Sequence, residues 1–87
     1  MSETRKVALI TGGGTGIGKH SALALLKEGF SVVIAGRRPE PLQEVVAEAG
    51  EAGSHILAVP TDVGDPASVR ALFAKTVETF GRLDVLF

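Results

Sequence analysis

Short, mostly apolar runs recur along the chain and are separated by longer segments that mix apolar and polar residues. The runs occupy residues 7–10, 31–35, 56–59 and 83–87. Short runs of this kind, rich in β-branched side chains, are typical of strands that are buried on both faces of a parallel sheet. The pattern therefore predicts four strands at these positions.

The segments between the first three runs have the spacing of amphipathic helices. A first helix is expected from Ile17 onward, and Gly29 stands where a helix would end. In the second segment, apolar residues at positions 42, 45, 46 and 49 fall on one helical face. Each of these helices can therefore pack against the sheet through its apolar side.

A third helix is predicted between the last two strands. It begins at Asp65 and Pro66, because an aspartate can cap the first helical turn and proline suits the geometry of that turn. Gly81 closes it. The helical spacing gives it a face made of Val69, Leu72, Phe73, Thr76, Val77 and Phe80.

The elements follow one another in the order βαβαβαβ. Strands that alternate with helices predict an α/β fold, in which a doubly wound parallel sheet has right-handed crossovers and helices on both faces. Because Val7–Ile10 is apolar throughout, we expect this strand in the centre of the sheet and the strand order 3-2-1-4.

A glycine-rich loop, residues 11–18, joins the first strand to the first helix. Glycines leave room for a ligand against the backbone, and the start of the following helix offers free N–H groups to a pyrophosphate. Neither GxGxxG nor a P-loop can be read here, and the pattern that stands is TGxxxGxG. The alternative is a tight turn that binds nothing.

Composition excludes several other classes of function. The chain has 87 residues, 45% of them hydrophobic and 22% charged, and a formal net charge of −1. This balance gives no attraction to nucleic acid or to a membrane surface, and no apolar run approaches the roughly 20 residues of a membrane span. With no cysteine, and with His20 and His55 isolated, we expect no metal site. The expectation is a soluble cytoplasmic protein without a nucleic-acid or membrane partner.

Four segments together resemble the short-chain dehydrogenase/reductase family. They are VALITGGGTGIG at residues 7–18, AGRR at 35–38, TDV at 61–63 and GRLDVL at 81–86. The resemblance covers essentially the whole chain. It implies a Rossmann-type fold in which residues 1–87 form the dinucleotide-binding half-domain of an oxidoreductase.

The resemblance also assigns roles to individual residues. In the family the glycine loop wraps the pyrophosphate of a nicotinamide dinucleotide, and here that loop supplies Gly12, Gly14, Thr15, Gly16, Ile17 and Gly18. Asp62 would accept a hydrogen bond from the adenine amino group, and the backbone of Val63 would lie beside the ring. The alternative for Asp62 is a turn or helix-entry residue, a role that Asp65 fits better.

The end of the second strand favours NADP(H) over NAD(H). Proteins that bind NAD carry a carboxylate here for the ribose 2′-hydroxyl, but this chain has Gly36 followed by Arg37 and Arg38. A guanidinium can hold a 2′-phosphate through two charge-assisted hydrogen bonds. The alternative, solvated turn arginines, stays open, because many NADP-binding members of the family also carry a basic residue where this chain has Thr15.

The chemistry that the resemblance implies needs residues that the chain does not contain. The family uses a tyrosine as acid and base, with a lysine and a serine, and this chain has no tyrosine. We therefore assign no catalytic residue and expect an inactive fragment that lacks the catalytic half. The parent would transfer hydride between NADP(H) and an alcohol or carbonyl substrate and would form a homo-oligomer. The alternatives are a non-catalytic nucleotide-binding module and a structural half that pairs with a separate carboxyl-terminal chain.

Overall fold

The computed structural model of the chain describes residues 5–12 and 16–86, with the backbone alone for residues 51–53. The strands are β1 (Val7–Thr11), β2 (Ser31–Gly36), β3 (Ile56–Pro60) and β4 (Val85–Leu86). The helices are α1 (Gly16–Lys27), α2 (Pro39–Ala49), the 3₁₀-helix η1 (Gly50–His55) and α3 (Pro66–Phe80).

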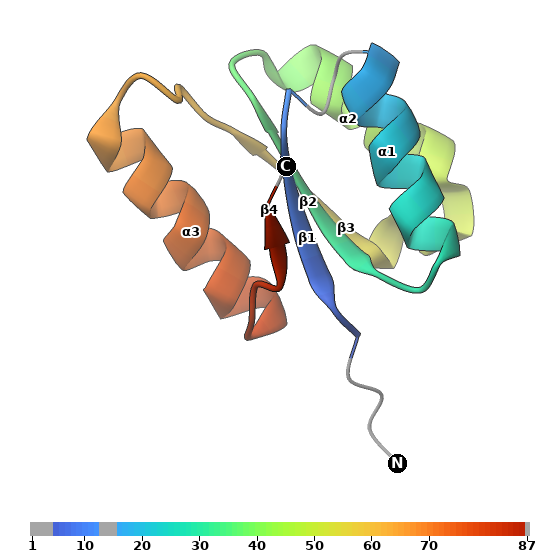
Figure 1. The fold of residues 1–87 in the computed structure, drawn as a ribbon. Helices are drawn as coiled ribbons and strands as arrows, with labels where there is room; N and C mark the ends of the chain where they lie inside the picture. The colour runs from blue at the N-terminus through green and yellow to red at the C-terminus, as the bar shows by residue number, and fades with distance from the viewer. Residues whose placement is uncertain (1–4, 13–15, 87) are drawn as a thin grey trace.

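The strands form one parallel sheet in the order β3-β2-β1-β4, as the sequence predicts. Every residue of β1 pairs with β2, from Val7 opposite Ser31 to Thr11 opposite Ala35. The helices α1 and α2 cover one face of the sheet and α3 covers the other (Figure 1). The predicted α/β architecture, with helices on both faces, is therefore confirmed.

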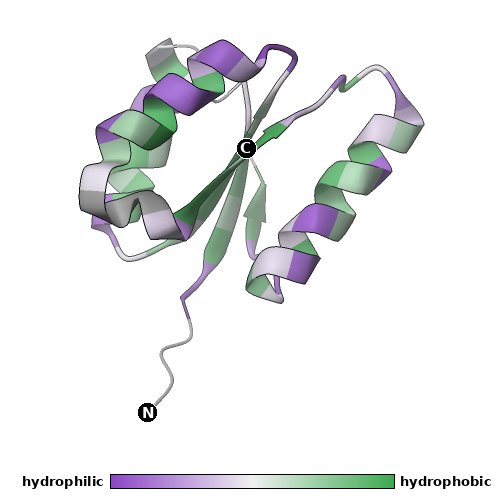
Figure 2. Cartoon of the chain, turned by 180° about the vertical axis from the view of Figure 1, so that it is seen from behind, coloured by the Kyte–Doolittle hydropathy of each residue, from purple (hydrophilic) through white to green (hydrophobic). Residues whose placement is uncertain are grey.

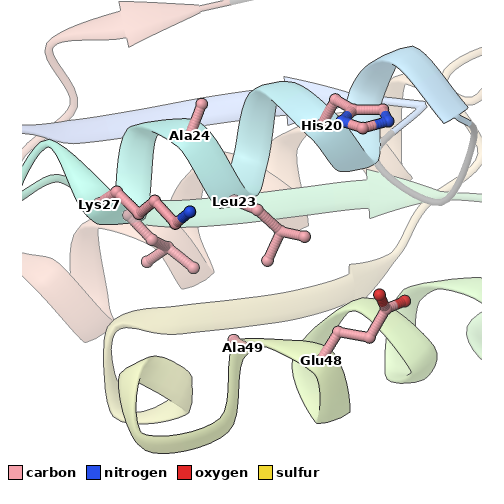
Figure 3. Close-up of a pocket in the computed structure, with 7 residues that line it drawn as sticks. His20, Leu23, Ala24, Lys27, Glu48 and Ala49 are labelled. Atoms are coloured by element: carbon pink, nitrogen blue, oxygen red, sulfur yellow. The ribbon is translucent and has the colours of Figure 1, made fainter.

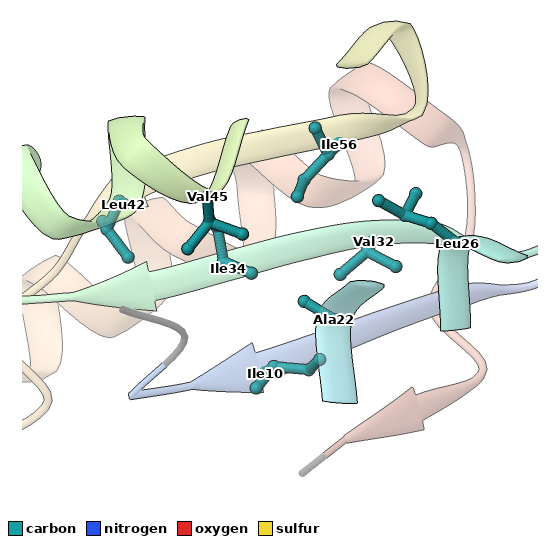
Figure 4. Close-up of a cluster of buried hydrophobic side chains, with 8 residues drawn as sticks. All are labelled: Ile10, Ala22, Leu26, Val32, Ile34, Leu42, Val45 and Ile56. Atoms are coloured by element: carbon teal, nitrogen blue, oxygen red, sulfur yellow. The ribbon is translucent and has the colours of Figure 1, made fainter. Parts of the chain in front are cut away.

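The core has two parts because side chains alternate along each strand. The part under α1 and α2 comprises Ile10, Ala22, Leu26, Val32, Ile34, Leu42, Val45 and Ile56 (Figure 4). The part under α3 comprises Val7, Leu9, Val33, Ala35 and Leu72. Neighbouring residues of β2 thus serve opposite faces, so the strand must be apolar throughout. Figure 2 shows this concentration of apolar residues along the strands.

The helix ends follow the signals in the sequence. The carboxylate of Asp65 accepts a hydrogen bond from the N–H of Ala67 at 3.1 Å and so caps α3. At the other end of α3, Gly81 has φ of 81° in the left-handed region, and its N–H donates to the carbonyl of Val77 at 2.7 Å. Among the described helices, none combines the length and the hydropathy that a membrane span requires.

All four strands differ by a residue or two from the predicted runs, and β1 and β2 each extend one residue further, to Thr11 and Gly36. β3 includes Pro60, which the sheet tolerates because β3 lies at its edge. The 3₁₀-helix η1 precedes β3 and ends at His55, and no pattern in the sequence predicted this helix. β4 spans only Val85–Leu86, because at Asp84 the side-chain carboxylate, and not a backbone carbonyl, accepts the hydrogen bond from the N–H of Val7 in β1. Phe87 lies outside the described residues.

The face of α3 is narrower than the sequence predicts. Leu72 and Thr76 are buried, and the Thr76 hydroxyl donates to the carbonyl of Leu72 at 2.8 Å. Phe73 and Val77 were placed on the same face, but they are 36% and 52% exposed. A single helix on this side of the sheet buries only the stripe that points directly at the strands.

Asp84 ties β4 to the central strand. Its N–H donates to the carbonyl of Val7 at 2.9 Å, and its Oδ2 accepts from the N–H of Val7 at 2.8 Å. Arg82 donates to the same carboxylate through Nε at 2.8 Å and Nη2 at 2.6 Å. The hydrogen bonds from Arg82, and then the one from Val7, hold the pKa of Asp84 below its ordinary value.

We predict that Asp84→Asn lowers the thermal unfolding temperature by a few degrees at neutral pH. Because the pKa of Asp84 is lowered on folding, the ionised carboxylate stabilises the folded chain above the unfolded-state pKa of about 3.9. That contribution is lost as the pH falls through the folded-state pKa. The difference between wild type and variant should therefore shrink below about pH 4, measured by circular dichroism.

The matched control is Asp65→Asn, because asparagine caps a helix about as well as aspartate. This variant should unfold close to the wild-type temperature. An Asp84→Asn defect of the same size at pH 7 and pH 3 would contradict the assignment of the effect to the carboxylate charge.

Candidate functional site

The carboxyl ends of β1, β2 and β3 bring distant parts of the chain together at one edge of the sheet. The N–H of Gly12, after β1, donates to the carbonyl of Ala35 in β2 at 2.8 Å. The N–H of Thr61, after β3, donates to the carbonyl of Gly36 at the end of β2 at 2.6 Å. The loops after the three strands are therefore direct neighbours, and open parallel sheets bind ligands at this edge.

The turn after β1 has the geometry that a close backbone approach requires. Gly12 has φ of 69°, in the left-handed region where a side chain is strained. α1 then begins at Gly16 with no acidic residue in its first turn, and the first N–H groups of an α-helix have no acceptor within the helix. Gly18 is buried, whereas the side chain of Ile17 is 84% exposed. Gly14 and Thr15 lie outside the described residues.

The turn after β2 presents one arginine to solvent and uses the next to enter a helix. A Cβ built on Gly36 would meet Leu42 Cδ2 at 3.5 Å, an ordinary contact, so a side chain fits here. The side chain of Arg37 is 79% exposed. Arg38 is exposed at the N-cap position of α2, where its side chain makes no capping hydrogen bond, and Pro39 follows.

The turn after β3 holds Asp62 in a defined orientation. Its Oδ1 accepts a hydrogen bond from the N–H of Gly64 at 3.0 Å, and its own N–H donates to the hydroxyl of Ser68 at 2.9 Å. The next residue, Val63, exposes 62% of its surface. The structure thus places Asp62 and Val63 beside the turn that carries Arg37.

An ion pair that the sequence did not predict joins these turns. Arg37 Nε lies 4.0 Å from Asp62 Oδ1. The two residues are far apart in sequence and share no local motif. They come together because the strand register places Gly36 opposite Pro60. The ion pair could have been predicted only if this register had been known.

A separate hollow of about 500 Å³ lies between α1 and α2 (Figure 3). Its walls are His20, Leu23, Ala24, Leu26, Lys27, Glu48 and Ala49. Glu48 also forms an ion pair with Lys19 across the two helices. Among the described residues, none of those in the turns that follow the strands lines this hollow.

The fold and the turn after β1 define the class of protein. A parallel sheet in the order β3-β2-β1-β4, with a glycine-rich turn after its central first strand, is a Rossmann-type α/β arrangement. A profile of the short chain dehydrogenase family matches residues 6–87. The chain belongs to the short-chain dehydrogenase/reductase family.

Individual relatives agree with this assignment. A hydroxynaphthalene reductase-like protein of Metarhizium robertsii is 45% identical over 86 residues, which are 98% of this chain and 32% of that protein. A short-chain dehydrogenase/reductase of Burkholderia phymatum in complex with NAD has a TM-score of 0.89 at 36% identity, with 100% of this chain and 31% of that one covered. An actinorhodin polyketide ketoreductase variant with NADPH gives 0.89 at 38% identity, with 99% and 33% covered. The chain thus spans about a third of the length of these relatives.

We predict that Gly12→Ala and Gly16→Ala differ sharply in their effect on stability. At Gly12, φ of 69° would cost an alanine roughly 1–2 kcal/mol, so the free energy of unfolding should fall by about that amount. A Cβ on Gly16 meets nothing within 4 Å, and alanine favours the helix there, so the matched variant should be at least as stable as wild type. Urea unfolding measures both, and equal losses would contradict the argument.

Proposed function

We propose that the chain is the cofactor-binding part of an oxidoreductase that transfers hydride between NADP(H) and an alcohol or carbonyl substrate. Membership of the family supports the oxidoreductase class. The observation that carries the choice of NADP(H) is the turn after β2, where Gly36 offers no carboxylate and the exposed Arg37 follows. The non-catalytic module, the alternative from the sequence, has no observation in its favour.

The described residues fit a dinucleotide. A pyrophosphate carries negative charge, and the start of α1 offers it N–H groups with no acidic side chain in the first turn. The open space at Gly16 and the bend at Gly12 leave the backbone accessible. In the proposal Gly14, Thr15, Ile17 and Gly18 complete this pyrophosphate-binding loop.

The adenosine end of the cofactor would lie across the turns after β2 and β3. Asp62 offers a fixed carboxylate to the adenine amino group, and the exposed Val63 offers an apolar surface beside the ring. The guanidinium of Arg37 would hold the 2′-phosphate, with Arg38 as a second cation. Similar structures hold NAD in one case and NADPH in another. In the proposal, these side chains decide between the two cofactors.

When bound, the nicotinamide would supply the hydride chemistry, and the residues of this chain would hold and orient the cofactor. The acid and base of the reaction, a tyrosine in the family to which the chain belongs, would come from outside these 87 residues, which contain no tyrosine. The substrate would likewise be held by residues beyond this half-domain. A homo-oligomeric, cytoplasmic parent protein completes the proposal.

We predict that Arg37→Ala in the complete gene product weakens NADPH binding and leaves NADH binding nearly unchanged. Losing a charged hydrogen-bond partner typically costs about 1.5–3 kcal/mol, which corresponds to roughly 10- to 150-fold in affinity. The exposure of Arg37 places the expected loss toward the lower end. Isothermal titration calorimetry with both cofactors measures the two dissociation constants.

The reciprocal change is Gly36→Asp, at a position where a Cβ would make only an ordinary contact with Leu42. It adds an acceptor for the 2′-hydroxyl and a charge that repels the 2′-phosphate, so the preference should turn toward NADH. Arg70→Ala, which removes the same charge from the exposed surface of α3, is the matched control. If Arg37→Ala weakened the binding of NADPH and of NADH equally, Arg37 would be a turn residue with no role in the choice of cofactor.

We also predict that the isolated 87-residue chain shows no turnover with NADPH and any carbonyl compound, since it contains no tyrosine to donate the proton. Absorbance at the NADPH band follows the reaction. The complete gene product, assayed in parallel, is the positive control. Measurable NADPH oxidation by the purified 87-residue chain would refute the proposal that the acid and base lie outside these residues.

A further inference from the structure

Arg37 and Asp62 face each other across the ends of β2 and β3. Their Nε and Oδ1 atoms are 4.0 Å apart, and both side chains are largely exposed. Among the ion pairs between described residues, this is the one that joins two of the turns that follow the strands. The cation proposed for the 2′-phosphate therefore already has an anionic neighbour.

The carboxylate of Asp62 is held at this place by its own turn. Its Oδ1, the atom nearest Arg37, accepts from the N–H of Gly64 at 3.0 Å. A Cβ on Gly64 would come within 3.3 Å of the same oxygen, so the absence of a side chain there lets the carboxylate fold back. Ser68 fixes the backbone through the N–H of Asp62 at 2.9 Å. Asp62 is thus a preoriented charge.

We propose that Asp62 is a specificity-determining residue that competes with the cofactor's 2′-phosphate for Arg37 and so limits the preference for NADP(H). This inference rests on the proposed function. A 2′-phosphate would have to share the guanidinium with a carboxylate that its turn keeps nearby, and the two anions repel each other. The neutral 2′-hydroxyl of NAD(H) meets no such repulsion.

The two cofactors separate this effect from the other proposed role of Asp62. A hydrogen bond to the adenine amino group would be common to both cofactors, and its loss would cancel in the ratio of their dissociation constants. The competition for Arg37 acts on the phosphorylated cofactor alone. The ratio of the NADH to the NADPH dissociation constant therefore measures it.

The test is Asp62→Asn in the complete gene product, titrated calorimetrically with both cofactors. Asparagine keeps an oxygen acceptor for the N–H of Gly64 and removes the charge. Because exposed ion pairs contribute little, we expect the ratio to rise about two- to fivefold. The rise should diminish at high ionic strength.

The matched control is Asp65→Asn, which removes the same charge from the same loop and keeps the cap of α3. This variant should leave the ratio within the error of the wild-type value. In an Arg37→Gln background the rise caused by Asp62→Asn should be smaller, because only the direct repulsion between the carboxylate and the 2′-phosphate is left to relieve; a rise as large as in the wild-type background would refute the competition. Asp62→Ser, whose hydroxyl can still accept from Gly64, replaces Asp62→Asn if the latter does not fold.

The outcomes separate the inference from the proposed function. If wild type binds NADPH and Arg37→Ala weakens it, but Asp62→Asn leaves the ratio unchanged or lowers it, the competition is refuted and the proposed function stands. Equal rises in Asp62→Asn and Asp65→Asn would also refute the competition, because they would show a general charge effect. If wild type binds neither cofactor, the competition and the proposed function are both refuted.

Discussion

The hydrogen bonds between β1 and β2 hold together two strands that are enclosed on both faces, and the positions of the helices and turns depend on them. Ala8, Leu9 and Val33 are completely buried within this pairing. A shift of the register would move apolar side chains from one half of the core to the other, which the packing on both faces opposes. The register in turn places the end of β1 beside the end of β2, so that Gly12 meets Ala35.

The two outer strands, β3 and β4, are held to the sheet in different ways. β3 follows β2 along its length and brings the Asp62 turn against the Arg37 turn. β4 makes a short pairing with β1, and the charged side chain of Asp84 reinforces it at the end of the sheet opposite the proposed cofactor site. At one end of the sheet the Asp84 side chain is thus bonded to the backbone of β1, whereas at the other end the paired side chains of Arg37 and Asp62 are largely exposed.

Local patterns in the sequence were enough to predict the strands and the helix ends, which depend on interactions between residues close together in the sequence. Unbroken apolar runs predicted β1, β2 and β3, and Asp65 and Gly81 marked the ends of α3, because burial and capping act within a few residues. The exposure of Phe73 and Val77 was not predictable, since helical spacing does not say how much of a helix face its neighbours cover. The Arg37–Asp62 pair was also missed, because it depends on strand register.

In the proposed site, buried and exposed parts of the chain would recognise different parts of the cofactor. Recognition of the pyrophosphate would use backbone groups at the bend of Gly12 and the start of α1, which are fixed by the packing of β1 and α1. Recognition of the ribose substituent would use the exposed side chains of Arg37 and Asp62. Since neither side chain belongs to the core, either can change without disturbing the sheet. Cofactor preference in such a site is free to vary, while the binding of the dinucleotide is tied to the stability of the fold itself.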